Sequence, residues 1–185
     1  MNIKLIKTKI PDIKVFQPNI HIDERGYFFE SFNENIYKKH LPSINFVQDN
    51  ESMSSYGVLR GLHYQVKPYD QAKLIRVIKG EIQDVAIDLR KNSKTYLDHV
   101  SINISSTNKK QIYIPKGFAH GFLVLTDQAI INYKVDKFYS KDHEKGLRFD
   151  DPSFNIKWDL NHSEIILSKK DRNHNFFNNN IEEII

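Results

Sequence analysis

Two stretches say most about the fold: Arg60–Gln65, which reads RGLHYQ, and Pro115–His120, which reads PKGFAH. Each contains one histidine, His63 or His120, and each has the pattern of a β-hairpin or a strand end. The spacing of these two histidines is that expected for the two halves of a small β-barrel site. The residues around them determine what chemistry such a site performs.

Most of the chain has the pattern of short strands. The run 74–78 is rich in β-branched residues and ends at the turn signal Lys79-Gly80, which leads directly into the segment 81–90. That segment alternates, with Val85, Ile87 and Leu89 on one face and Asp84, Ala86 and Asp88 on the other. Further strands are expected at 98–104, 110–114, 121–125 and 129–137.

Helical patterns are few and short. A helix is expected from Asn33, as its N-cap, to His40, because Pro42 follows just past the end. A second short helix is expected near 171–176, and the chain after Asp151 is expected to lie over the barrel. The sequence therefore predicts a mainly β protein: a jelly-roll β-barrel with a few short peripheral helices. It forms one domain over 1–185, with an asparagine-rich tail from about 173 that is expected to fray.

Composition limits the classes of function. The chain has 185 residues, 39% hydrophobic and 27% charged, which suits one ordinary globular domain. The absence of cysteine excludes disulfides and thiolate metal sites. No apolar run reaches the length of a membrane span, so a cytoplasmic protein without a membrane partner is expected. The net charge of +4 is scattered, which argues against nucleic acid but suits a small anionic ligand.

The two histidine stretches resemble the motifs of the cupin superfamily. Metal-binding cupins carry two histidines separated by one residue, then a glutamate, and a further histidine in the second motif. Here Gln65 stands at the second histidine position and Lys73 at the glutamate position. An ammonium group repels a divalent cation, and His63 and His120 alone do not make a usual zinc or iron site. No metal is therefore expected.

Without a metal, the same residues suit proton transfer. An imidazole such as His63 accepts a proton near neutral pH. Lys73, with His120 and Arg60 nearby, stabilises negative charge on an oxygen. Tyr133 lies in phase with the inward positions of its strand, and its phenol can donate a proton from the opposite side. This set fits removal of a proton beside a ketone and its return on the other face, an epimerisation that needs no cofactor.

Each of these residues also has an ordinary structural role. Taken singly, His63 is more often a hydrogen-bonded structural histidine, Tyr133 a core tyrosine and Lys73 an exposed lysine. Asp171 would by default be the N-cap of the last short helix. Only their occurrence together favours catalysis.

An ordered set of stretches also resembles a known family. The chain closely resembles the dTDP-4-dehydrorhamnose 3,5-epimerases, cofactor-independent cupins that act on a 4-keto-6-deoxy sugar nucleotide. The resemblance covers about positions 20 to 171. The matching stretches are 23–30, 46–50, 57–65, 71–74, 80–90, 114–122, 151–152, 156–158 and 167–171.

This resemblance implies a role for each residue. His63 is expected to be the base that removes the C5 and C3 protons, and Asp171 is expected to orient it. Tyr133 is expected to be the acid, and Lys73 to stabilise the enolate oxygen. The resemblance further implies substrate-binding roles for Arg25, Glu30, Gln48, Asp49, Asn50, Arg60, His120, Glu144 and Lys170.

The family also implies a homodimer in which N-terminal segments cross between protomers, so that Arg25 reaches the partner's site. Asp84 is expected to pair with Lys73 or His120, because its strand position faces inward. His21 and Glu51 depart from residues common in the family, which leaves UDP, GDP and CDP open beside dTDP.

Several functions remain open at this point. The leading hypothesis is conversion of dTDP-4-dehydro-6-deoxy-glucose to dTDP-4-dehydro-L-rhamnose. A relative that inverts only C3 or only C5 would use the same base and acid. A silent sugar-nucleotide-binding cupin, a metal-dependent cupin dioxygenase and a 3,4-ketoisomerase fit the residues less well.

Overall fold

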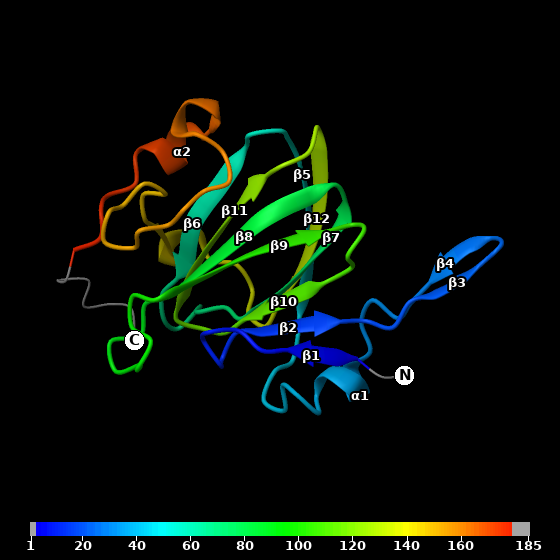
Figure 1. Cartoon of the computed structure of the whole chain (residues 1–185). Coiled ribbons are helices and arrows are strands. Elements are labelled where there is room, and N and C mark those ends of the chain that lie inside the picture. The colour runs from blue at the N-terminus through cyan, green and yellow to red at the C-terminus, as the bar shows by residue number, and fades with distance from the viewer. Residues whose placement is uncertain (1–2, 179–185) are drawn as a thin grey trace.

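Two antiparallel sheets pack face to face in this computed structural model, which describes residues 3–178 (Figure 1). The larger sheet has the order β1 (Lys4–Ile6), β2 (Lys14–Gln17), β10 (Gln111–Ile114), β7 (Lys73–Lys79), β12 (Gln128–Val135), β5 (Gln48–Ser55). The smaller sheet has the order β13 (Glu144–Gly146), β6 (Leu59–Gln65), β11 (Phe118–Val124), β8 (Glu81–Asp88), β9 (His99–Ser105). This arrangement confirms the predicted cupin-type jelly roll.

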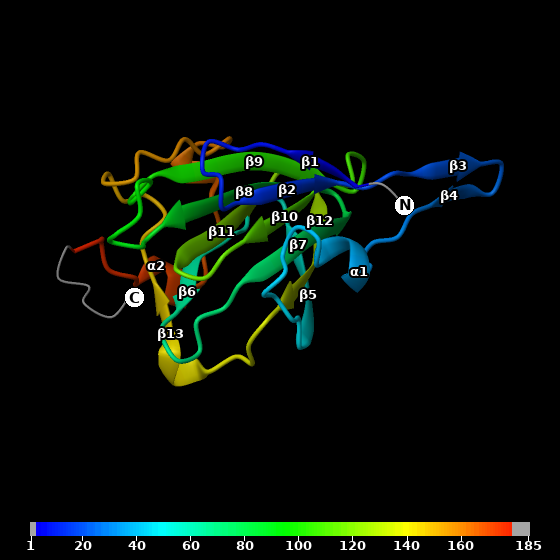
Figure 2. The same ribbon diagram turned by 90° about the horizontal axis from the view of Figure 1, so that it is seen from below.

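A separate hairpin leaves the barrel near the N-terminus. It consists of β3 (His21–Asp23) and β4 (Gly26–Phe28), and Figures 1 and 2 show it extending away from both sheets. Its apolar side chains Ile22, Tyr27 and Phe28 are exposed to solvent. We refer to residues 21–28 as the arm.

The main core lies between the two sheets. Ile75 and Ile131 of the larger sheet pack in one buried cluster with Ile82 and Ala86 of the smaller sheet. The other face of β8 is buried as well, since Val85 and Ile87 lie in a second cluster with Leu89, as the predicted alternation requires. Both faces of the smaller sheet are therefore covered, which explains why almost every residue of β8 is buried.

Segments at the two ends of the chain cover the outer faces. Phe154 is buried in the second cluster, and Ile156 and Trp158 pack against it, so the prediction that the chain crosses the barrel after Asp151 is confirmed. On the larger sheet, Tyr37 after the arm packs with residues of β2 and β7 in a third cluster.

The helices are shorter than the sequence pattern suggested. The first, α1 (Glu34–Tyr37), begins at the predicted N-cap Asn33, whose side chain accepts a hydrogen bond from the amide of Ile36. It ends three residues before His40, because the amides of Lys39 and His40 bond to carbonyls three residues back and form turns. The predicted C-terminal end was therefore wrong.

The second helix, α2 (Lys169–Arg172), begins two residues before the predicted range 171–176 and overlaps it only at 171–172, with Ser168 as its N-cap. Two single 3₁₀ turns, η1 (Lys141–His143) and η2 (His162–Glu164), complete the helical elements of the described residues. Within residues 3–178, no helix has the length and apolar character needed to cross a membrane.

The asparagine-rich tail is docked as far as residue 178, so the expected fraying from 173 was wrong for this part. Asn175 forms a parallel bridge with Leu147, and its carbonyl accepts the amide of Arg148 at 3.2 Å. Phe177 packs against Phe154 with ring centroids 5.5 Å apart. Apolar packing thus outweighs the polar composition of the tail, and the remainder of the predicted tail lies outside the described residues.

Close backbone contact at Gly61 aligns the two histidine strands. Gly61 has φ +127, and a Cβ there would lie 2.6 Å from Gly121 Cα on β11. The pairing of β6 with β11 is irregular at this point, between His120 and Phe122. Next to it, His63 and His120 are direct register partners, both inside strands rather than at strand ends as the sequence suggested.

Candidate active site

A cavity opens between the two sheets. It contains five of the predicted site residues, which come from four strands of two different sheets. The lining residues are Ser52, Arg60, His63, Lys73, Ile75, His120, Phe122, Ile131 and Tyr133.

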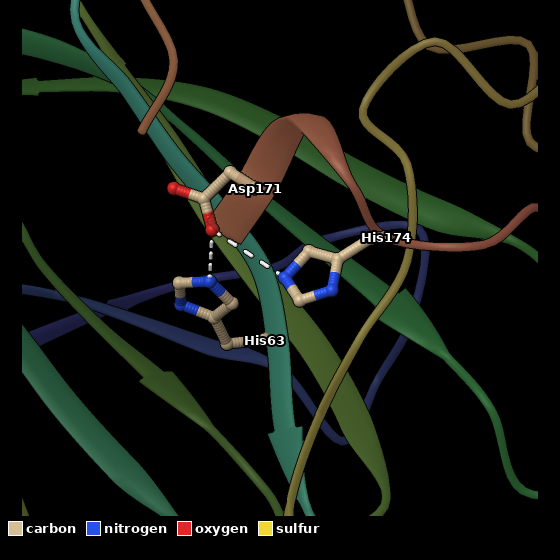
Figure 3. A group of neighbouring side chains, drawn as sticks. All are labelled: His63, Asp171 and His174. Carbon is tan, nitrogen blue, oxygen red and sulfur yellow. Dashed lines mark hydrogen bonds and ion pairs between the residues drawn. The ribbon is translucent and has the colours of Figure 1, made fainter. Parts of the chain in front are cut away.

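His63 is held by a buried carboxylate. Its Nε2 lies 2.5 Å from Oδ1 of Asp171, while Oδ2 accepts a hydrogen bond from Ser168 at 2.9 Å (Figure 3). Burial disfavours the Asp171 carboxylate, but hydrogen bonds from His63 and Ser168 outweigh this effect and lower its pKa. Because Nε2 faces the carboxylate, Nδ1 is the nitrogen that remains to accept a proton.

Asp171 is not the N-cap of α2, which would have been its ordinary structural role. Ser168 is the N-cap, and its Oγ accepts the Asp171 amide at 3.0 Å. The Asp171 side chain is thereby free to point at His63 from the first turn of α2, with only 4% of its surface exposed.

Lys73 is half-buried in the cavity wall. Burial lowers its pKa to about 8, although the carboxylates of Asp84 and Glu144 act in the opposite direction. At neutral pH the amine therefore stays mostly protonated while it lies in surroundings of low polarity. A cation placed in this way interacts strongly with a developing oxyanion.

His120 has a carboxylate partner of its own. Its Nε2 lies 2.9 Å from Oδ2 of Asp84, which confirms one of the two predicted partners of Asp84. Burial is the largest influence on His120 and lowers its pKa despite that carboxylate. His120 is therefore predominantly neutral at pH 7 and suits hydrogen bonding better than charge stabilisation.

Tyr133 faces the cavity from the other sheet. It lies on β12, directly opposite Ile75 of β7 and Asn50 of β5. Burial raises its pKa above the ordinary value of 10, so the phenol keeps its proton at neutral pH. The candidate acid and the candidate base thus approach one cavity from opposite sheets, as two-sided proton transfer requires.

Glu144 and Lys170 are not among the residues that line the cavity, and they pair with each other. Their side chains form an ion pair, and Tyr139 donates a hydrogen bond to the same Glu144 oxygen at 2.7 Å. Burial disfavours the Glu144 carboxylate, but these two donors lower its pKa overall. The glutamate therefore stays ionised and adds negative charge near Lys73.

The three predicted residues of β5 divide between two faces. Gln48 and Asn50 share the face of Ser52, which lines the cavity, and the Gln48 amide donates to Asn50 at 2.8 Å. Asp49 points the other way and pairs with Lys134 at 2.6 Å.

Two predicted binding residues lie away from the cavity of their own chain. Arg25 is on the arm, where it pairs with Asp23 and has 85% of its side chain exposed. Glu30 follows the arm, and its Oε1 accepts a hydrogen bond from Asn33. Neither is among the residues that line the cavity.

Several lining residues were not predicted from the sequence, although a simple rule would have found them. Each lies two positions from a predicted residue on the same strand, and period two places both on one face. They are Ser52 beside Asn50, Ile75 beside Lys73, Phe122 beside His120 and Ile131 beside Tyr133.

His174 was missed as well, because it lies in the asparagine-rich tail. Its Nε2 is 3.4 Å from Asp171 Oδ1, and together with His63 it gives three potential metal ligands within 4.8 Å of one another. However, the 2.5 Å contact between His63 and Asp171 is shorter than the roughly 3.3 Å between two ligands of a tetrahedral zinc ion. These donors fit a hydrogen-bonded group better than a metal centre.

Comparison with known proteins identifies the family of the chain. The sequence profile of the dTDP-4-dehydrorhamnose 3,5-epimerases matches residues 7–179. The chain belongs to this family. It is 50% identical to the dTDP-4-dehydrorhamnose 3,5-epimerase of Shigella flexneri, over 91% of this chain and 93% of that protein.

Solved structures of epimerases share the fold over nearly the whole chain. The dTDP-4-dehydrorhamnose 3,5-epimerase of Elizabethkingia anophelis NUHP1 superposes with a TM-score of 0.90 at 45% identity, covering 96% of this chain and 97% of that one. An epimerase of Legionella pneumophila, solved with dTDP-4-keto-L-rhamnose, gives a TM-score of 0.91 at 43% identity, with 95% and 93% covered. The predicted family and fold are therefore confirmed.

Proposed function

We propose that this chain inverts C3 and C5 of a dTDP-linked 4-keto-6-deoxy-hexose, converting dTDP-4-dehydro-6-deoxy-glucose to dTDP-4-dehydro-L-rhamnose. The observation that carries this proposal is the position of His63 and Tyr133, which face one cavity from opposite sheets. Both inverted carbons flank the C4 ketone, so the substrate itself makes their protons acidic and no cofactor is needed.

Each inversion has two proton transfers. His63, through Nδ1, takes the proton from C5, and the electron pair of that C–H bond moves onto the C4 oxygen as an enolate. Lys73 stabilises this oxygen with its buried positive charge. Tyr133 then protonates C5 from the opposite face, and the ketone re-forms. The same sequence at C3 completes the reaction, after His63 and Tyr133 exchange their protons with solvent.

Asp171 supports the base during this cycle. An imidazolium forms on His63 when the ring takes the substrate proton, and the carboxylate 2.5 Å away stabilises that charge. It also fixes the proton on Nε2 before the reaction, which keeps Nδ1 unprotonated. Arg60 and His120 line the same cavity and suit the sugar and diphosphate oxygens.

The nucleotide is proposed to lie along β5 toward the rim. Gln48 and Asn50 share the Ser52 face of that strand and offer amide groups suited to a pyrimidine base and its ribose. Lys170, which pairs with Glu144, is proposed to bind a phosphate through its ammonium group. Asp49 faces away from this path and is the weakest of the proposed binding residues.

We propose further that the protein is a homodimer in which the arms are exchanged. Ile22, Tyr27 and Phe28 are exposed on a hairpin that leaves its own barrel, which is costly unless another surface covers them. Exchange would bring Arg25 and Glu30 to the partner's cavity. Light scattering of the purified chain should give twice the monomer mass, and Ile22→Asp together with Phe28→Asp should lower it to that of the monomer.

The reaction is tested by incubating the protein with dTDP-4-keto-6-deoxy-glucose in D₂O and following the sugar by NMR. Deuterium at both C3 and C5, with formation of the L-sugar, supports the proposal. Deuterium at one carbon alone would show a mono-epimerase, and tight binding without exchange would show a silent cupin. The same assay with excess EDTA should be unchanged, whereas loss of activity would indicate a metal-dependent enzyme.

A further inference from the structure

His174 contacts both members of the pair formed by His63 and Asp171, and it does not line the cavity. It follows α2, and its ring meets the His63 ring edge to face, with centroids 5.6 Å apart and planes at 80° (Figure 3). Its Nε2 faces Oδ1 of Asp171 at 3.4 Å, the same oxygen that His63 contacts. One carboxylate oxygen is therefore shared between two imidazoles.

The polar contact of His174 is weak, whereas its packing is tight. Nε2 is shielded from solvent, and no atom of the described residues meets hydrogen-bond geometry with it. The side chain is 13% exposed. A histidine held this closely, with an unpaired nitrogen, contributes mainly through the position of its ring.

The strand opposite His63 makes room for this ring. Gly146 of β13 is the direct register partner of His63 on β6. A Cβ at residue 146 would lie 2.2 Å from His174 Nε2 and 2.3 Å from Cε1, so only glycine leaves the space that the ring occupies. The bridge between Leu147 and Asn175 fixes the backbone on both sides of this contact.

We propose that His174 is a positioning residue for the base. Its ring packs against His63 and blocks rotation of the imidazole away from Asp171, so that Nδ1 stays aimed at the substrate. It does not line the cavity, and therefore it acts through His63 rather than on the sugar. This inference rests on the proposed function, in which one ring must take protons from two different carbons in turn.

The test uses two single variants and their combination. His174→Ala removes the ring, and Gly146→Ala retains the ring but displaces it, because the added Cβ would overlap it. Each should lower kcat by roughly tenfold with KM changed less than twofold, because small misplacements of a reacting group cost rate rather than binding. The double variant should lose no more than either single variant, since both act on the same contact.

Four results would decide against the proposal or the function on which it rests. Wild-type protein must epimerise in the same assay; if it does not, the proposed function fails and not this inference alone. If His174→Ala keeps kcat within twofold of wild type, or if the two losses multiply in the double variant, the positioning role is refuted. A rise of KM with kcat unchanged would also refute the positioning role, because that result would place His174 in substrate binding. Thermal unfolding of each variant shows that the compared proteins are folded.

Discussion

His63 stands directly opposite His120 in the pairing of β6 with β11, and each imidazole has its own buried carboxylate. The two pairs differ in access: the His63 side chain is 27% exposed, whereas that of His120 is 9% exposed and has a pKa lowered by burial. The more accessible imidazole, backed by Asp171, is the one that we propose as the base. Its register partner on the neighbouring strand, His120, is proposed to bind the substrate.

His63→Ala should abolish exchange at both C3 and C5, since one base serves both carbons. We expect a loss of on the order of 10²–10⁴ in rate, the usual contribution of a positioned base. Deuterium wash-in followed by NMR measures each carbon separately. His162→Ala, which removes an exposed histidine, is the matched control. Survival of exchange at either carbon would assign that proton to another base.

Tyr133→Phe should separate the two halves of the reaction. His63 still removes the proton, so deuterium continues to enter the substrate from the base side. Return of the proton from the opposite face requires the phenol, and inverted product should fall by roughly 10²-fold or more. The ratio of label in recovered substrate to label in product reports the split. Equal losses in both would mean that Tyr133 is not the acid.

The pH dependence of kcat/KM should have an alkaline limb near pH 8. Burial lowers the Lys73 pKa to about 8, and the lysine loses its charge above that pH. Tyr133 does not cause this limb, because its pKa is raised above 10. Lys73→Met should give a low, flat profile over pH 7–9, while Tyr133→Phe should keep the limb in its residual exchange.

Stability should change in the opposite direction over the same range. The folded-state pKa of Lys73 lies below the ordinary 10.5, so the unfolded chain binds more protons between about pH 8 and 10.5. The Lys73 contribution to the free energy of unfolding therefore rises with pH in this window. Urea unfolding of the wild type and of Lys73→Met, at pH 8 and at pH 10.5, isolates the Lys73 contribution. If the difference in free energy of unfolding between the two proteins did not depend on pH, the lowered pKa would be contradicted.

Gly61→Ala should destabilise the fold strongly. The residue combines φ +127 with a backbone 2.6 Å from where a Cβ would lie, and a shift there separates β6 from β11. We expect a loss on the order of 3 kcal/mol in the free energy of unfolding. Gly26→Ala is the matched control, because Gly26 has φ +125 with nothing within 4 Å, and should cost about 1–2 kcal/mol. If both variants lost the same free energy of unfolding, the close contact at Gly61 would make no contribution to stability.

The sequence alone predicted the parts of this site that depend on local pattern. Strand alternation placed Tyr133 and Asp84 inward, and Asp84 is found paired with His120, one of its two predicted partners. The position of Lys73 in the cupin motif predicted that it shares a pocket with His63, and both residues line the cavity. The position of Asp171 came only from family resemblance, because its contact with His63 joins residues 108 apart in the chain.

The errors at the C-terminal end have a common physical origin in tertiary packing. Composition predicted a fraying tail, but Phe177 and Asn175 find partners on the barrel that no local pattern reveals. His174 was missed for the same reason. The helix expected to reach His40 ends early, because the hydrogen bonding changes to turns after Tyr37.

The arm has a consequence for protomers that are damaged in different places. Arg25 lies on a hairpin outside its own barrel, while His63 stays inside. Under the proposed exchange, a protomer with His63→Ala still lends its intact arginine to a neighbour with Arg25→Ala, whose imidazole is sound. Two preparations with little activity on their own should therefore recover about a quarter of the normal number of working centres when equal amounts are unfolded together, mixed and refolded, because half of the dimers are mixed and each has one sound centre. Mixing that restores nothing would confine each centre to a single chain.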